Sequence, residues 1–163
     1  MKQNVLHRLS VMIFLVLGSA SCGFSPVYAP GSNTAAALSD IVVAPPNNNR
    51  PNYIFVTELE DRIGRNPNGS KELKHDIWVY EEDPGLVSST ARIHLVGKVT
   101  YQVVSVEDGR FLFGGTVENF VAFTVDDNLT TAVRNDATER LMKTLADHMV
   151  TRLTVQFSRL ADE

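Results

Sequence analysis

The sequence predicts one α+β domain, a two-layer sandwich of about four mostly antiparallel strands packed under two helices. Three observations predict this fold class. The chain has 163 residues, of which 44% are hydrophobic and 21% charged, which is typical of a single folded domain. Residues 92–125 alternate polar and apolar side chains over much of their length. From Thr130 to about Leu160 the apolar side chains recur at helical spacing instead.

Residues 1–21 are predicted to form a lipoprotein signal peptide. Lys2 and Arg8 make a basic start, and the apolar run at 11–17 is too short to span a membrane, which takes roughly 20 residues. Four small residues then lead to Cys22, the only cysteine of the chain. Such a segment resembles a bacterial lipobox, although Ser19 stands where Leu is most common. Cys22 is therefore the predicted lipidation site.

Two other interpretations of this segment stay open, an ordinary signal peptide cut near Ala20 and an uncleaved anchor. In the lipoprotein class, acyl chains such as palmitate are attached to the cysteine, and two or more chains hold a protein firmly to one leaflet. Gly23 follows in place of the Asp that retains many Gram-negative lipoproteins in the inner membrane. The expected location is therefore the periplasmic side of the cell outer membrane.

The mature chain is predicted to divide into a lipidated tether at 22–37 and a folded domain at 38–163. The tether is rich in Gly, Pro, Ser and Ala. Residues 38–44 are β-prone and end at two prolines, which predicts a first strand.

A helix is predicted next, with Asn52 as its N-cap and Gly64, or the turn that follows, as its end. Its apolar stripe consists of Val56, Leu59 and Ile63.

A second strand is predicted at 75–80, followed by a long hairpin. Gly97 interrupts the apolar row of the first hairpin strand and is predicted to mark a bulge. Asp108-Gly109 is a strong turn signal. The predicted dry face comprises Ile93, Leu95, Val99, Tyr101, Val103, Phe111, Phe113, Val117, Val121, Phe123 and Val125.

Phe120 and Ala122 lie out of phase with the dry face of the return strand. Two interpretations stay open for them: they pack in a local bulge, or they contact a partner on the outer face.

The last predicted element is a long helix, about 45 Å at 1.5 Å per residue. Asp127 or Asn128 is the expected cap, and Glu139 and Lys143 form a favourable i,i+4 pair. A helix of this length must cover the apolar face of the hairpin. Its predicted apolar stripe comprises Val133, Ala137, Leu141, Met142, Leu145, Ala146, Met149, Val150, Leu153, Phe157 and Leu160.

Neither a catalytic motif nor a metal motif is found in the sequence. The histidines of the mature chain, His75, His94 and His148, are isolated, and one cysteine cannot form a disulfide framework or a cysteine-built metal site. Without residues 1–21 the chain has thirteen basic and nineteen acidic residues, a net charge of −6, which argues against nucleic-acid binding. We therefore expect a binding protein that is no enzyme and needs no cofactor.

Three basic residues are candidates for binding an anionic ligand. Arg92 and Lys98 lie on the wet face of the predicted hairpin. Arg134 lies in the first turn of the long helix, where a cation is mildly unfavourable against the helix dipole. An arginine at such a position has more claim to a binding role than a random surface arginine.

The segment Cys22-Gly23-Phe24-Ser25-Pro26-Val27-Tyr28 resembles the Cys-Gly-Phe-x-Pro-Leu-Tyr opening of the LptE family of lipopolysaccharide-assembly lipoproteins, alphaproteobacterial type. Residues 92–153 also follow the order of that family: a long hairpin, a Phe-rich return strand, an acidic turn and a long helix. The resemblance implies a non-enzymatic protein that plugs an LptD-type β-barrel of the outer membrane, helps to assemble it, and takes part in lipopolysaccharide transport and insertion.

The resemblance also implies a ligand and its contacts. Arg134 matches a basic family position implicated in lipopolysaccharide binding. A second basic position falls in residues 85–89, which contain no cation here, so Arg92 or Lys98 is the expected substitute. An auxiliary envelope lipoprotein of another lipid-transport complex is the alternative, and an enzyme with an unrecognised site is the third interpretation.

Overall fold

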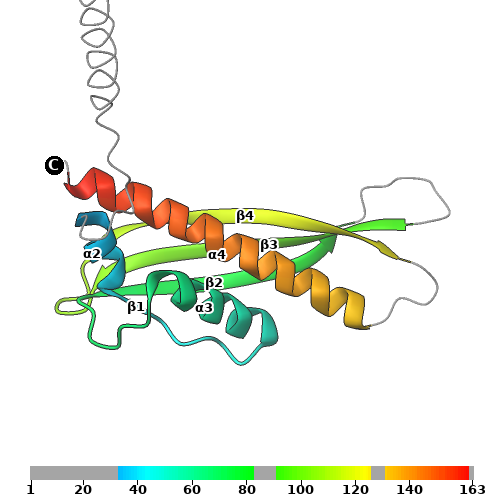
Figure 1. The fold of residues 1–163 in the computed structure, drawn as a ribbon, viewed down its shortest axis with the longest axis horizontal. Coiled ribbons are helices and arrows are strands. Elements are labelled where there is room, and N and C mark those ends of the chain that lie inside the picture. The colour runs from blue at the N-terminus through cyan, green and yellow to red at the C-terminus, as the bar shows by residue number, and fades with distance from the viewer. Residues whose placement is uncertain (1–32, 83–90, 126–130, 162–163) are drawn as a thin grey trace, which may run out of the picture.

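The fold is a four-stranded sheet covered on one face by helices. The computed structural model describes residues 33–82, 91–125 and 131–161 (Figure 1). The elements follow in the order α2 (Asn33–Ser39), β1 (Ile41–Val43), α3 (Arg50–Ile63), β2 (Lys71–Glu82), β3 (Ala91–Ser105), β4 (Phe111–Val125) and α4 (Thr131–Ala161). The strand order is β1-β2-β3-β4, with β1 parallel to β2 and the other pairs antiparallel. The predicted α+β class is confirmed, with α2 as an additional short helix.

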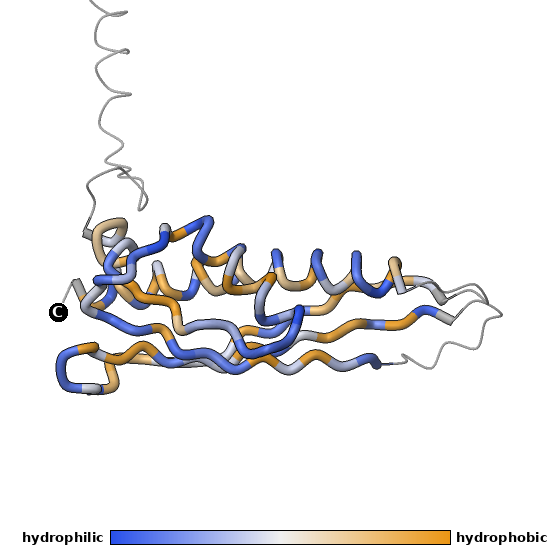
Figure 2. The backbone as a smooth tube through the Cα atoms, turned by 90° about the horizontal axis from the view of Figure 1, so that it is seen from below, coloured by the Kyte–Doolittle hydropathy of each residue, from blue (hydrophilic) through white to orange (hydrophobic). Residues whose placement is uncertain are grey.

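The core lies between the sheet and the helix layer. In Figure 2 the hydrophobic side of α4 faces the strands and its hydrophilic side faces away. α4 contacts α2, α3, β3 and β4, so it runs along much of the sheet. Large side chains with essentially no exposure come from both layers: Ile41, Phe55, Leu59, Leu73, Val99, Val103, Leu141, Met142, Leu145, Met149 and Leu153.

The start of the domain differs from the prediction. The strand expected at 38–44 is limited to Ile41–Val43, and α2 already begins at Asn33, inside the segment expected to be a tether. Residues 35–37 are all alanine, the best helix former. Leu38 then enters the core with 5% exposure. The helix was not predicted because residues 22–37 as a whole are rich in Gly, Pro and Ser, which favoured a tether.

The N-cap of α3 is Asn49, three residues before the predicted cap. Its Oδ1 accepts the backbone N–H of Asn52 at 2.9 Å, and Pro51 occupies the first turn, where its missing N–H costs nothing. Asn52 itself is buried inside the helix. Gly64 ends α3 with a φ of 87°, as predicted.

The bulge of the hairpin lies elsewhere than predicted. Pairing continues regularly through Gly97, whose missing side chain instead makes room for α4: a Cβ there would lie 2.7 Å from Leu145 Cδ1. The register shifts at Val103/Val104, so that Phe111 pairs with Val104 and is 61% exposed rather than on the dry face. The predicted turn is confirmed, with Gly109 at a φ of 70°.

The long helix is confirmed as α4, and so is the ion pair between Glu139 and Lys143 at 2.9 Å. Val133 and Leu160 are wrong as core residues, being 38% and 47% exposed. Residues spaced by four advance about 40° around a helix of 3.6 residues per turn, so the ends of a long stripe rotate off the core. The predicted caps Asp127 and Asn128 lie outside the described residues.

Candidate binding surfaces

We call the face of the sheet that the helices of residues 33–82 and 131–161 leave uncovered the helix-free face. It has an aromatic patch near the ends of β2 and β4 that lie far from α2. We use this name for Trp78, Tyr80 and Phe120, which are 63%, 43% and 53% exposed. The strand register places Tyr80, Val96 and Phe120 side by side across three strands, with Val96 only 6% exposed between the two rings. Three large exposed aromatic side chains around one buried valine indicate a surface for a partner or ligand.

Polar groups surround the aromatic patch. The ring of His94 stacks on Phe120 with a centroid distance of 4.6 Å. Beside Trp78, Lys98 Nζ lies 3.8 Å from Glu118 Oε2 on the neighbouring strand. The pKa of the Tyr80 hydroxyl is raised, first by desolvation and then by nearby carboxylates. An apolar centre with a charged rim is the usual make-up of an interaction surface.

The strand register decides whether Phe120 and Ala122 pack in a local bulge, one of the two interpretations that the sequence left open. Both lie in regular register on the outer face, opposite Val96 and His94, and the only register shift between β3 and β4 lies at Val103/Val104. The local-bulge interpretation is therefore wrong. Trp78 and Tyr80 were missed because β2 was treated as a strand without a defined face; their i,i+2 spacing was the available signal.

The structure does not bring the three predicted basic residues together. Arg134 belongs to the helix layer, where its Nε donates to Glu81 Oε1 at 2.8 Å. Arg92 and Lys98 lie on the helix-free face, six positions apart along β3, or about 20 Å at 3.3 Å per residue. Lys98 is paired with Glu118, whereas no ion pair within the described residues includes Arg92. Any shared ligand would have to be large.

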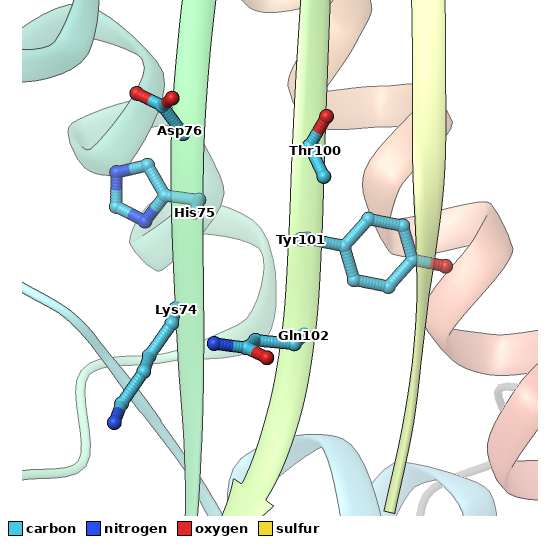
Figure 3. Close-up of a pocket in the computed structure, with 6 residues that line it drawn as sticks. All are labelled: Lys74, His75, Asp76, Thr100, Tyr101 and Gln102. Atoms are coloured by element: carbon cyan, nitrogen blue, oxygen red, sulfur yellow. The ribbon is translucent and has the colours of Figure 1, made fainter. Parts of the chain in front are cut away.

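A hollow of about 330 Å³ opens between β2 and β3 (Figure 3). Lys74 and Asp76 extend from β2, and Thr100 and Gln102 from β3; Gln102 reaches toward β2 in this view. The charge of Lys74 is balanced by Glu72 at 3.6 Å. The hollow therefore contains one cation, one carboxylate and neutral polar groups, which define neither a nucleophile–base pair nor a charged subsite.

His75 lies at the edge of the same hollow, and its ring turns toward the helix layer. The ring packs against Phe55 with a centroid distance of 5.6 Å, and its Nδ1 has no hydrogen-bond partner. Desolvation lowers the pKa of His75, opposed by the charge of Asp76. A largely buried imidazole against an aromatic ring fits a packing role.

Within residues 33–82, 91–125 and 131–161, no group of three or more His, Cys, Asp or Glu side chains could hold a metal ion. Among the helices of these same ranges, none is long and apolar enough to cross a membrane. Cys22 and the motif at 22–28 lie outside the described residues, as do residues 85–89.

Comparison with solved structures shows that another protein shares this fold. A crystal structure of a lipoprotein from Caulobacter crescentus CB15 aligns with a TM-score of 0.63 and 16% identity, over 77% of this chain and 96% of that one. A minor lipoprotein from Acinetobacter baumannii aligns with a TM-score of 0.49 and 12% identity, over 71% and 91% of the two chains. Comparison with curated proteins gave no match.

Comparison with protein families gave a match over the domain itself. Residues 38–153 match the family model LptE, described as lipopolysaccharide-assembly. The match begins at the end of α2 and includes both strands of the hairpin and most of α4. This chain therefore belongs to the LptE family of lipopolysaccharide-assembly lipoproteins.

Proposed function

We propose that this chain is an outer-membrane lipoprotein, anchored through Cys22 on the periplasmic side, that plugs and helps to assemble an LptD-type β-barrel and takes part in lipopolysaccharide transport and insertion. The observation that carries the proposal is the family match over residues 38–153. The opening motif Cys22–Tyr28, with the only cysteine at its start, supports the anchor.

The aromatic patch supports the contact with a barrel. Trp78, Tyr80 and Phe120 are exposed on the face of the sheet that the helices of the described residues leave uncovered. Aromatic side chains are enriched at the centres of protein interfaces, where they bury much area at a low cost in conformational entropy. The proposed contact joins this patch to the inner wall of the barrel.

Co-purification with the barrel protein tests the plug role. We expect Trp78→Ser combined with Phe120→Ser to reduce the amount of barrel protein recovered with the tagged lipoprotein at least tenfold, because two interface anchors are lost. Phe111→Ser is the matched control: Phe111 is an equally exposed aromatic residue on the same face, at the other end of β4. Equal loss with the control, or no loss with the double variant, would contradict the contact.

Lipopolysaccharide contact is proposed for Arg134, Arg92 and Lys98. The guanidinium of Arg134 already binds Glu81, so a phosphate group would have to replace that carboxylate. Arg92 has no such competitor within the described residues and lies on the same face as Lys98. Arg92 is the second residue of β3, whereas Lys98 lies at the middle of that strand.

Retention of lipopolysaccharide by the purified protein tests these residues. Arg134→Asp is expected to lower retention without unfolding, and Glu81→Gln to raise it, because the second change frees the same guanidinium. Arg92→Asp and Lys98→Asp test the other two positions. Unchanged retention in both Arg134→Asp and Glu81→Gln would remove Arg134 from the proposal.

The anchor has its own test. Intact mass of the protein from native membranes should equal residues 22–163 plus a diacylglyceryl group and an amide-linked acyl chain. Cys22→Ser should abolish the added mass. A product that retains Met1, or an unmodified Cys22 thiol, would refute lipidation.

A further inference from the structure

The two edges of the sheet differ in how they are protected against pairing with another strand. β1, at one edge, has three residues and is followed by Ala44 and two prolines, which lack the N–H that pairing needs (Figure 1). β4, at the other edge, has fifteen residues, no proline, lysine or arginine, and one charged side chain, Glu118. Its register is regular from Phe113 to Val125. β4 therefore lacks the short length, prolines, lysines and bulges that usually protect an edge strand.

The hydrogen bonds of the hairpin show which backbone groups of β4 point away from β3. Ser105, the last residue of β3, donates its N–H to the carbonyl oxygen of Arg110 at 2.9 Å. Successive residues of a strand direct their N–H and C=O groups to opposite sides, so the odd-numbered residues of β3 bond to β4. Their partners in the register are the odd-numbered residues of Phe113–Val125. The even-numbered residues from Gly114 to Thr124 therefore direct their N–H and C=O groups to the open edge.

The Phe120 N–H supports this assignment independently. It donates to the side-chain Oδ1 of Asn119, its neighbour in the same strand, at 2.8 Å. No hydrogen bond within residues 33–82, 91–125 and 131–161 joins this edge of β4 to a further strand. The edge thus presents a row of donors and acceptors that repeats every two residues, or about 7 Å. Another extended polypeptide backbone has the matching repeat.

α4 forms a wall beside part of this edge. A groove of about 390 Å³ opens between Thr116 and Glu118 of β4 and residues 148–155 of α4. Its α4 side includes Arg152 and Val155, and Val155 is 42% exposed. Because Glu118 and Arg152 carry opposite charges, the groove does not select a ligand by net charge. Addition of an extended segment to a sheet edge is a recurring mode of recognition, in which backbone hydrogen bonds give affinity and side-chain pockets give specificity.

The position of Phe120 indicates which polypeptide occupies the edge. Phe120 belongs to the aromatic patch and is also one of the even-numbered residues of β4. A strand added to β4 would lie beside Phe120, so the sheet edge and the aromatic patch form one continuous surface. The partner that covers the patch would therefore also reach the edge.

We propose that β4 pairs along residues 114–124 with an extended segment of the barrel protein, whose small or apolar side chains face Val155 of α4. This pairing depends on the proposed plug role and specifies how the barrel is held. The Phe120 N–H exchanges its bond to Asn119 for a bond to the added strand. Until then the Asn119 amide occupies one donor at the centre of the edge.

Amide hydrogen exchange, resolved to single residues, tests the pairing by comparing the full lipoprotein alone with its complex with the barrel protein. In the free chain we expect slow exchange at Val117 and Val121, which bond to β3, and fast exchange at Thr116, Glu118 and Ala122. In the complex the even-numbered amides should slow about tenfold or more, because each gains a backbone hydrogen bond. Contact through the aromatic side chains alone would leave the alternation between odd and even residues unchanged.

A proline at the edge provides a second test. Thr116→Pro removes one outward N–H, and a sheet tolerates proline on an edge strand when that N–H faces solvent. Recovery of the barrel protein with the tagged variant should fall about tenfold, because a carbonyl of the added strand loses its donor. Thr116→Ala is the matched control: it removes the exposed side chain but keeps the N–H, so recovery should stay within about twofold of the unmodified chain. Thermal unfolding checks both variants, and Ala122→Pro replaces Thr116→Pro if the latter does not fold.

The outcomes separate this pairing from the plug role. Recovery of the barrel protein without slower exchange at the even-numbered amides would overturn the pairing and leave the plug role intact. Equal recovery with Thr116→Pro and Thr116→Ala would overturn it as well. Slowing that appears in the lipoprotein alone as its concentration rises would assign the edge to a second copy of this chain. Failure of the unmodified lipoprotein to recover any barrel protein would overturn both proposals.

Discussion

The contact between Gly97 and α4 gives a quantitative prediction about stability. A Cβ at residue 97 would lie 2.7 Å from Leu145 Cδ1 and 3.0 Å from Leu141 Cδ2. Both leucines have no exposed surface, so they cannot move into solvent. Overpacking of a core costs about 1–3 kcal/mol. Replacing glycine by alanine also reduces the conformational entropy of the unfolded chain, which stabilises the folded state by up to about 1 kcal/mol. We therefore expect Gly97→Ala to lower the free energy of unfolding by about 1–2 kcal/mol.

Leu145→Ala supplies the other half of a double-mutant cycle. Truncation of a fully buried leucine costs about 3 kcal/mol or somewhat more. In the double variant the new methyl group occupies part of the space that Leu145 Cδ1 leaves, and Leu141 can shift into the rest. We therefore expect the double variant to be more stable than the sum of the single effects by about 1–2 kcal/mol.

Urea unfolding followed by circular dichroism measures all four free energies of unfolding. Gly109→Ala is the control: a Cβ there meets no atom within 4 Å, and the cost of its positive φ should add to that of Leu145→Ala without coupling. Additivity of Gly97→Ala with Leu145→Ala within about 0.5 kcal/mol would refute the reasoning. So would a stabilising Gly97→Ala, because it would mean that α4 leaves room at this crossing.

Three further predictions concern ionisable and capping groups. Burial lowers the pKa of His75 below its usual 6.5, so on acidification the His75 imidazole of the unfolded chain is protonated before that of the folded chain. The free energy of unfolding should therefore fall as pH drops through 6.5. His75→Gln should reduce this fall, measured as the pH dependence of the urea midpoint. The pKa of Asp40 is lowered from 3.8 to about 2, chiefly by its hydrogen bond from Lys71, so its contribution is present above pH 3.8 and lost between about 4 and 2. Asp40→Asn should cost about 1 kcal/mol at neutral pH, since the pair is partly exposed and screened, and should remove that acid-induced loss; equal acid profiles would contradict the assignment. Asn49→Ala should cost about 1 kcal/mol as the cap of α3, measured by urea unfolding, and an equal loss in Asn49→Asp would show that capping is not the cause.

Periodicity predicted the parts of the fold that bury one face of a regular element. The alternation of β3 and the four-residue spacing in α4 were enough to pair a hairpin with a covering helix, because both elements expose their other face to water. The prediction failed where a local contact decided the outcome. Asn49 rather than Asn52 caps α3 because Pro51 lies between them, and a bulge near the turn moves Phe111 to the outer face.

The candidate binding surfaces could be predicted from the sequence only in part. The sequence singled out Arg134 by its place in the first turn of the helix, but its partner Glu81 lies 53 positions away and is brought near only in the folded chain. The aromatic patch depends on the register of three strands, which places Tyr80 and Phe120 on either side of Val96. Sequence spacing within one strand gives the face of each residue and not its cross-strand neighbours.

The late position of α4 in the chain has a consequence for biosynthesis. α4 supplies more of the large, fully buried side chains than any other described element: Leu141, Met142, Leu145, Met149 and Leu153. Because the ribosome makes the chain from its N-terminus, all four strands of the sheet are synthesised before α4, the helix that covers them. Until the last thirty or so residues appear, the apolar side of the sheet is open to aggregation. Nascent chains that stop before residue 131 should be unable to close the fold and should depend on a holding chaperone.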